Sequence, residues 1–385
     1  MTRRQKLRAG CVALLVVSAL GVWNVSRVRH PSTPEATALG TIVSNAPDHL
    51  EVGRDCGYLR KDPTTPTDRH IWYFCDTSNE LVGLLQSSSA AGSITPGAQP
   101  SDLTEWSPTN QPAPWSTPTP VMNVDTEAGC ETGVMEAGNA HWENAGWNTG
   151  VVNIGNTSLI FSQTFCRSQQ TVRTFNVAEW TGNGPPQQQE VFSAPGGSID
   201  PRQQLGSPVI SGSYLYLFAS DLAEVSPHTG SIFVARVPLG ARPLVTTPWR
   251  EAANYQWWTG SDWSASYTDA TPIVEGPWER ASSIDFYPTF GSFRLLSQNN
   301  QYAPDLGETT VQGTFNVYEA DTPTGPWKLL YRDIAAPGCI SQTVDSNFDA
   351  CRALIGHPEL STARELLFTF YSPSTRQVTL ARMPK

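Results

Sequence analysis

Strand-like segments separated by turn residues run through this chain, and no helical periodicity competes with them. After the first 30 residues, no stretch longer than about 12 residues places apolar side chains at the three- and four-residue spacing of an amphipathic helix. Short runs rich in aromatic and β-branched residues instead end at Gly, Pro, Asn or Ser, as β-strands do. Examples are HIWYFCDT, SPVISGSYLYLFAS, GSIFVARVPL and ELLFTFYS. The pattern predicts an all-β protein.

Two of these strand pairs repeat along the chain. YLYLFASDLAEVSPHTGSIFVARVP (214–238) parallels LLFTFYSPSTRQVTLARMP (366–384), and TPIVEGPWE (271–279) parallels TPTGPWK (322–328). Repeated antiparallel modules are typical of a β-propeller, in which each module buries its faces against its neighbours. The length allows five to seven blades of about 45 to 70 residues each. The polar, Pro- and Ser-rich segment 87–120 is expected to form a long loop.

The N-terminal segment has the layout of an export signal. A basic start precedes an apolar run from Cys11 to Trp23, which is shorter than the roughly 20 residues of an ordinary membrane span. We therefore expect residues 1–30 to be a cleaved signal peptide or an uncleaved membrane anchor, 31–46 a flexible linker and 47–385 a single propeller domain. The propeller is expected outside the cytoplasm, secreted or membrane-anchored, as a monomer that touches the membrane only through this segment.

The net charge of the chain limits which classes of partner it can bind. The formal net charge is −10, and it becomes −16 without residues 1–30, which hold six Lys and Arg and no acid. Such a surface repels phosphate backbones, so we expect no nucleic acid partner and a neutral or cationic ligand instead. The sequence contains no phosphate loop or dinucleotide fingerprint, and we expect no cofactor.

Six cysteines follow Cys11, an even number that suggests disulfides in an exported chain. Fifteen connectivities are possible. Order along the chain favours neighbours: Cys56 with Cys75, Cys130 with Cys166, and Cys339 with Cys351. A zinc site is the alternative, but the absence of a CxxC motif and the scarcity of histidine argue against any metal.

An aspartate stands beside a cysteine twice in RDCGYLRKDPTTPTDRHIWYFCDT, as Asp55-Cys56 and Cys75-Asp76. Strand interiors are poor in aspartate. The polar segment 61–69 can fold back as a hairpin and bring both acids to the same end. A Cys56–Cys75 disulfide would then hold the strands in register, contribute about 3 kcal/mol and fix the separation of the two carboxylates. The alternatives are a surface ion pair with Arg54 for Asp55 and an ordinary turn role before Thr77 for Asp76.

Four motifs together resemble the domain-of-unknown-function 4185 family. They are RDCGY with IWYFCDT, YQWWTGSDWS (255–264), TPTGPW, and IGHPELS (355–361), and the resemblance runs from about residue 48 to 384. It implies a five-bladed β-propeller related to furanosidase propellers. This sequence departs from the family in having Cys at two positions where Gly is usual.

The resemblance also implies a glycoside hydrolase, since some members are endo-D-arabinanases that cut the arabinan of mycobacterial arabinogalactan and lipoarabinomannan. Asp55 and Asp76 match the proposed catalytic acids of that family. Two carboxyl groups suffice for glycoside hydrolysis, and a separation of about 5 to 5.5 Å indicates retention, roughly 6.5 to 9.5 Å inversion. The implied partner is a cell-wall polysaccharide.

Further residues are candidates for sugar contact, because aromatic rings stack on sugars and acids or imidazoles bond their hydroxyls. They are His141, Trp142, Glu143, Trp257, Trp258, Trp263, His357 and Glu359. Loop, core and strand-entry roles are the alternatives. The alternative function is a non-catalytic cell-surface propeller that binds a glycan or a protein, favoured by the cysteines beside both acids, which could narrow the pocket.

Overall fold

The computed structural model describes most of the chain from residue 33 onward. The described residues are 33–43, 53–63, 69–79, 83–93, 104–105, 119–120, 144–166, 171–181, 186–193, 199–220, 231–240, 247–275, 279–299, 310–311, 313–339, 342–343 and 351–385. Residues Thr33–Lys385 belong to one compact body. The predicted export segment at 1–30 lies outside the described residues, and among the residues described no helix is long and apolar enough to cross a membrane.

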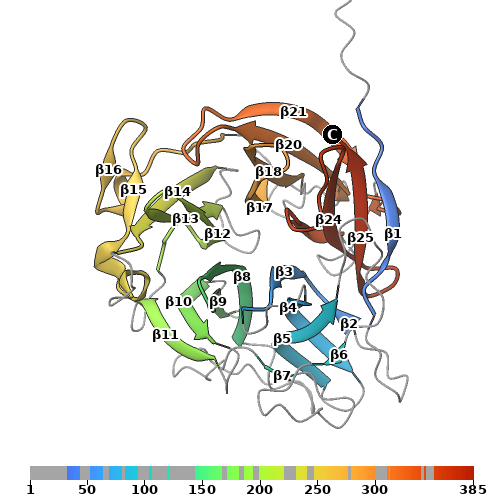
Figure 1. Ribbon diagram of the computed structural model, residues 1–385, viewed down its shortest axis with the longest axis horizontal. Helices are drawn as coiled ribbons and strands as arrows, with labels where there is room; N and C mark the ends of the chain where they lie inside the picture. Colours follow the sequence, from blue (N-terminus) through green and yellow to red (C-terminus); the bar gives the residue numbers. More distant parts are fainter. Residues whose placement is uncertain are drawn as a thin grey trace, which may run out of the picture. The chain divides into compact units, whose positions relative to one another are not determined.

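Five antiparallel sheets stand around a common centre and form a five-bladed β-propeller, as predicted (Figure 1). The first blade contains β2 (Gly53–Arg54), β3 (Tyr58–Lys61), β4 (Arg69–Asn79), β5 (Gly83–Ser93), β6 (Thr104–Glu105) and β7 (Thr119–Pro120). The second contains β8 (Asn144–Ile154), β9 (Thr157–Cys166), β10 (Thr171–Trp180) and β11 (Gln187–Ser193). The third contains β12 (Gln204–Ser211), β13 (Tyr214–Ser220), β14 (Ile232–Pro238), β15 (Gln256–Trp258) and β16 (Trp263–Ser264).

The fourth blade contains β17 (Glu279–Tyr287), β18 (Ser292–Asn299), β20 (Thr314–Ala320) and β21 (Lys328–Ala335). The fifth contains β23 (Arg352–Gly356), β24 (Glu365–Ser372), β25 (Gln377–Pro384) and β1 (Thr37–Thr41). A separate pair joins β19 (Thr310–Val311) to β22 (Gln342–Thr343). Three short 3-10 helices, η1 (Pro248–Arg250), η2 (Ala252–Asn254) and η3 (Tyr267–Asp269), lie in the third blade's sequence. The strands nearest the centre are β3, β8, β12, β17 and β23 (Figure 1).

The ring is closed by β1, which pairs with β25 and places Thr37 opposite Arg382. The strand falls inside residues 31–46, which the sequence analysis treated as a flexible linker, so that boundary needs correction. Without β1, the unpaired backbone groups of β25 would form an exposed edge. Ile42, just after β1, donates its backbone N–H to the Val378 carbonyl at 2.8 Å and is 1% exposed.

The predicted loop at 87–120 also differs from the structure. The strand β5 continues to Ser93 and pairs with β4 along its length, from Asn79 opposite Gly83 to Arg69 opposite Ser93. Its sequence, GLLQSSSAAGS, is poor in β-branched and aromatic residues. Pairing with the aromatic-rich β4 overrides this weak local preference, as tertiary context commonly does for strands.

The hydrophobic core lies between blades rather than within one layer. Leu59 and Trp72 of the first blade pack with Leu367 and Leu380 of the fifth. Other clusters join the second blade to the third and the third to the fourth. Because each sheet buries both faces, the inner strands are held in fixed positions around the centre.

We predict that Ile42→Ala lowers the free energy of unfolding by about 2 to 4 kcal/mol. The side chain is fully buried against Leu59 and Trp72, and it anchors the strand that closes the ring. The control is Val43→Ala, since Val43 is 41% exposed and should change the value by less than about 0.5 kcal/mol. Urea denaturation measures both. Equal effects would show that β1 contributes nothing to closure.

Candidate functional site at the mouth of the propeller

Asp55 and Asp76 lie opposite each other on neighbouring strands. The register pairs Arg54 with Thr77 and Tyr58 with Tyr73, which places Asp55 across from Asp76. The Asp55 N–H donates to the Asp76 carbonyl at 2.9 Å. Side chains at directly opposite positions project from the same face of a sheet. Both aspartates are half-buried, and the Asp55 side chain is 13% exposed.

The adjacent pair of residues forms the predicted Cys56–Cys75 disulfide, with 5.5 Å between the Cα atoms. Cys56 has a φ of 50°, a left-handed conformation that favours glycine. That backbone requirement is the physical reason why glycine suits the position. The disulfide and a hydrogen bond from the Cys56 N–H to Asp55 Oδ1 (2.7 Å) hold a cysteine in this conformation instead.

The Cys339–Cys351 disulfide is also confirmed. Cys166 is disulfide-bonded, and Cys130 lies outside the described residues. Among the described residues, no group of three or more His, Cys, Asp or Glu side chains is placed to hold a metal ion.

Arg352 fixes the Asp55 carboxylate from the neighbouring blade. Its Nε and Nη2 donate to Asp55 Oδ2 at 2.8 and 2.7 Å, and its guanidinium lies 4.0 Å from the centre of the Tyr371 ring. Burial opposes the charge of Arg352, but Asp55, with a smaller contribution from Asp76, raises the Arg352 pKa above its ordinary value. Both carboxylates therefore lie in the field of one permanent cation.

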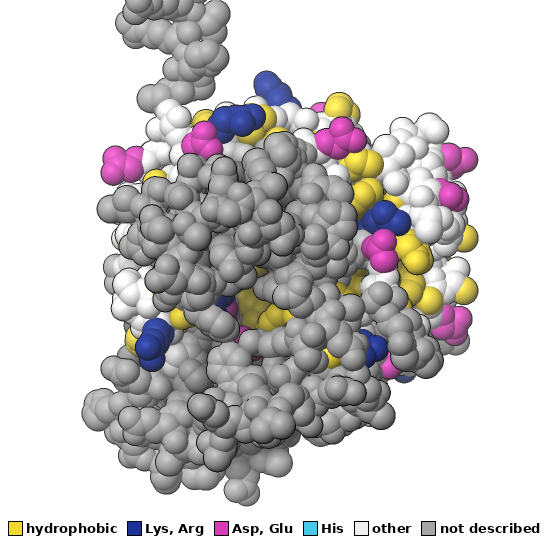
Figure 2. All heavy atoms as spheres, turned by 180° about the vertical axis from the view of Figure 1, so that it is seen from behind, with side chains coloured by type: hydrophobic (Ala, Val, Ile, Leu, Met, Phe, Trp, Pro, Cys, Tyr) yellow, Lys and Arg dark blue, Asp and Glu magenta, His cyan; other side chains and the backbone are white. Residues whose placement is uncertain are grey.

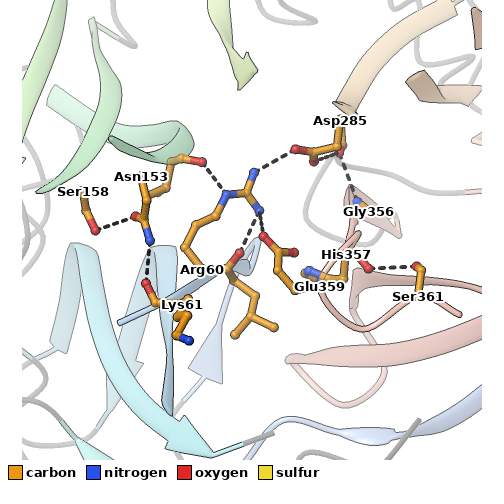
Figure 3. Close-up of polar contacts among 12 residues, drawn as sticks. Arg60, Lys61, Asn153, Ser158, Asp285, Gly356, His357, Glu359 and Ser361 are labelled. Carbon is orange, nitrogen blue, oxygen red and sulfur yellow. Dashed lines mark hydrogen bonds and ion pairs between the residues drawn. The ribbon is translucent and has the colours of Figure 1, made fainter. Parts of the chain in front are cut away.

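A second polar cluster lies further along the same inner strands and is centred on Arg60 (Figure 3). The Arg60 guanidinium donates to Asp285 Oδ1 at 2.9 Å, to Glu359 Oε1 at 3.0 Å and to the Val151 carbonyl at 2.7 Å. These partners come from the fourth, fifth and second blades, and Arg60 itself from the first. The Arg60 cluster, defined as Arg60, Asp285 and Glu359, thus joins three blades at the centre, and the Val151 carbonyl adds a fourth.

The two clusters occupy different depths. Asp55 precedes β3 and Arg352 begins β23, whereas Arg60 is near the end of β3 and Glu359 lies beyond the end of β23. Five residues of extended chain separate Asp55 from Arg60, or about 15 Å along the strand. We call the Asp55 level the mouth and the Arg60 level the floor.

One cation between two carboxylates leaves the floor with an excess negative charge. Burial raises the pKa of Asp285 to about 7, and Glu359 acts in the same direction although Arg60 opposes it. Asp285 therefore holds its proton in the folded protein over a pH range in which a solvated aspartate has lost it. Buried charges of one sign are avoided in this way.

His357 is fully buried beside the floor. Its Nε2 lies 2.9 Å from the Thr369 hydroxyl, and its ring meets Trp72 edge-on at 5.2 Å. Burial lowers the pKa of His357 to about 3, so the imidazole is neutral. Its surroundings are those of a core histidine, whereas Glu359, the other candidate from GHPEL, belongs to the Arg60 cluster.

The tryptophan candidates lie on the outer strands of the third blade, β15 and β16, away from Asp55 and Asp76 (Figure 1). Trp257 is 1% exposed and packs in the core. Trp258 and Trp263 are half-buried, with ring centres 5.3 Å apart. The candidates His141, Trp142 and Glu143 lie outside the described residues.

Sequence reasoning missed Arg60, Asp285 and Arg352. Arg60 follows Tyr58-Leu59 in a strand, and Asp285 stands between Ile284 and Phe286 in another. A charged residue inside an apolar strand signals a buried ion pair, so both could have been suspected. Their partners could not, because Arg60 and Asp285 are 225 positions apart.

Comparison with known proteins supports the fold. The solved structure of a "putative hydrolase from Bacteroides ovatus" aligns with a TM-score of 0.54 at 12% identity, over 93% of this chain and 97% of that chain. A structure of RS223-β-xylosidase aligns at 0.46 with 12% identity, over 88% and 95% of the two chains. A GH43_1 enzyme from Xanthomonas citri complexed with xylotriose aligns at 0.43 with 10% identity, over 90% and 89%.

No known family model and no curated protein sequence matches the chain. The chain is therefore defined by its fold, a five-bladed β-propeller, which the putative hydrolase from Bacteroides ovatus shares. The particular family indicated by the sequence motifs stays a proposal.

We predict that removing the Asp285 carboxyl flattens the dependence of stability on pH. With a pKa of about 7 in the folded state and 3.8 as the ordinary value, this group stabilises fully below pH 3.8 and loses its contribution as pH rises through 7, with a slope of up to ~1.4 kcal/mol per pH unit. Urea denaturation between pH 4 and 8 should show that slope reduced in Asp285→Asn. The exposed Asp321→Asn is the control, and identical curves for wild type and Asp285→Asn would contradict the prediction.

We also predict that the double variant Cys56→Ser/Cys75→Ser loses about 3 kcal/mol of unfolding free energy, because the disulfide restricts the unfolded chain. The Cys339–Cys351 disulfide closes a loop of similar length, 12 against 19 residues, so the Cys339→Ser/Cys351→Ser variant should lose a similar amount. Denaturation without reductant measures both. No loss in the first variant would remove the stabilising role assigned to this disulfide.

Proposed function

We propose that this protein is an exported glycoside hydrolase that cleaves a polysaccharide at the mouth of the propeller. The observation that carries the proposal is the placement of Asp55 opposite Asp76 at the start of the inner strand β3, with both side chains partly accessible. Glycosidic cleavage requires such a pair of carboxyl groups, one on each side of the scissile bond.

The contacts of Asp55 favour a division of roles. Its oxygens accept three hydrogen bonds, one from Cys56 and two from Arg352, so Asp55 is only an acceptor in these contacts. Asp55 is therefore assigned as the base or nucleophile. Asp76, on the adjacent strand, is assigned as the acid that protonates the leaving oxygen. Water then supplies the hydroxyl of the new reducing end, and its remaining proton is taken up by the carboxylate that acts as base.

The proposed substrate is an arabinofuranose-rich cell-wall polysaccharide. The order of the four motifs shared with the domain-of-unknown-function 4185 family supports it. The charge also supports it, because an acidic protein accepts a neutral polymer without repulsion. Figure 2 shows Lys, Arg, Asp and Glu side chains interspersed around the described rim. Two disulfides fit an oxidising compartment outside the cytoplasm.

The second candidate function is binding of a cell-surface glycan without cleavage. The ion pair with Arg352 favours it, because the same Oδ2 of Asp55 accepts both guanidinium hydrogen bonds. A carboxylate held in this way can bind a sugar hydroxyl through Oδ1 without attacking a carbon.

We predict that Asp55→Asn and Asp76→Asn each lower the rate of oligosaccharide release from arabinogalactan by at least ~100-fold, the scale of lost acid–base catalysis. Asp76→Asn should keep the wild-type melting temperature within about 3 °C, because the amide retains the size and one acceptor oxygen. Asp55→Asn should lower it further, because it removes the anionic partner of Arg352. Chromatography of the released sugars measures the rate, and a panel of other glycans tests the substrate class.

The control is Asp262→Asn, an exposed acid in the β15–β16 turn, which should release sugar at the wild-type rate. The binding function would instead be established if the wild-type protein bound arabinogalactan in a gel-shift assay and left every polymer intact. Full activity in both aspartate variants would remove the assigned roles.

A further inference from the structure

A pocket of about 620 Å³ lies between the fourth and fifth blades. It is lined by Arg294, Glu319, Leu330, Tyr331, Ala363, Arg364 and Lys385. Ala363 and Arg364 belong to the connection that follows β23, whereas Asp55 and Arg352 lie where β23 begins. The pocket is therefore near the floor end of the strands and does not share residues with the proposed active site.

Cationic side chains dominate this pocket. Arg294, Arg364 and Lys385 face a single side-chain carboxylate, that of Glu319. Arg294 is 2% exposed and forms an ion pair with Glu319, which also accepts a hydrogen bond from the Ser292 hydroxyl at 3.0 Å. Burial opposes ionisation of Glu319, but Arg294 lowers its pKa below the ordinary value. The carboxylate is thus ionised and committed to Arg294.

Among the described residues, the other two cations form no salt bridge, although Lys385 also contributes electrostatically to the lowered pKa of Glu319. Arg364 is exposed, and its backbone contacts Thr362 and Lys385. Lys385 places its ammonium 4.6 Å from the centre of the Phe290 ring, and the Arg294 guanidinium lies 5.1 Å from the same centre. Two cations against one ring repel each other, and the single charge of Glu319 acts on both of them.

We propose that this pocket binds the oxyanion group, carboxylate or phosphate, of a small ligand of monosaccharide size. The excess of three cationic side chains over one side-chain carboxylate supplies the attraction, and the buried Arg294 supplies a fixed guanidinium. Leu330, Tyr331 and Ala363 offer apolar surface to the rest of the ligand. The volume falls within the usual range of small-molecule sites, about 300 to 1,000 Å³. The inference goes beyond the proposed hydrolase and does not depend on it.

The test is titration calorimetry of the full-length protein at low ionic strength with D-glucuronate, glucose 6-phosphate and neutral D-glucose. We expect both anions to bind with a Kd on the order of 0.1 to 1 mM and glucose to bind at least tenfold more weakly. Stronger binding of glucuronate identifies a carboxylate site, and stronger binding of glucose 6-phosphate a phosphate site. Added salt, about 0.5 M NaCl, should weaken both.

The double variant Arg364→Ala/Lys385→Ala should raise the Kd of the anions at least tenfold. The matched control is Arg332→Ala, which removes an exposed cation next to Tyr331 on β21 that does not line the pocket. It should change the Kd less than twofold, and melting temperatures check the fold of both variants. The proposal is overturned if neither anion binds up to about 10 mM, if glucose binds as tightly, or if the double variant binds like the wild type.

Discussion

The Arg60 cluster is the interaction on which the geometry of this propeller depends. A guanidinium transferred from water into a protein interior loses several kcal/mol of hydration. The Arg60 guanidinium regains this free energy only where Asp285, Glu359 and the Val151 carbonyl converge (Figure 3). Hydrophobic contacts between blades tolerate small slips of one sheet against another, but these charge-assisted bonds do not. The Arg60 cluster, together with the Val151 carbonyl, therefore specifies how four inner strands stand relative to one another.

The Arg60 cluster also affects the ion pair between Asp55 and Arg352 at the mouth. Asp55 and Arg352 come from the first and last blades, which meet only where the ring closes. Their ion pair forms if β3 and β23 stand at matching heights, and the bonds from Arg60 to Glu359 set those heights about 15 Å away along the strand. The outer strand β1 supports the same junction from the opposite edge of the fifth blade. A structural ion cluster, a ring closure and a candidate active site are thus parts of one arrangement.

Sequence reasoning recovered what depends on local pattern. The aromatic and β-branched runs and the repeated hairpins gave the all-β propeller, and neighbouring positions gave the Cys56–Cys75 and Cys339–Cys351 disulfides. The five-blade number came from the family resemblance, because spacing alone allowed five to seven. Pairing across long sequence separations was not accessible. The role of β1 depends on a strand that lies more than 300 residues later, and the contact of Asp55 with Arg352 spans 297 positions.

Position along the inner strands distinguishes the two acidic groups, whereas side-chain exposure does not: it is 13% for Asp55, 10% for Asp285 and 22% for Glu359. Asp285 and Glu359 at the floor share a buried cation, and protonation of Asp285 relieves their excess charge. Asp55 and Asp76 at the mouth are half-buried, stand on neighbouring strands of one sheet and lie near a cation from another blade. Both carboxyl groups at the floor are bound by Arg60, whereas those at the mouth stand on neighbouring strands of one sheet. We therefore assign the proposed chemistry to the mouth and a structural role to the floor.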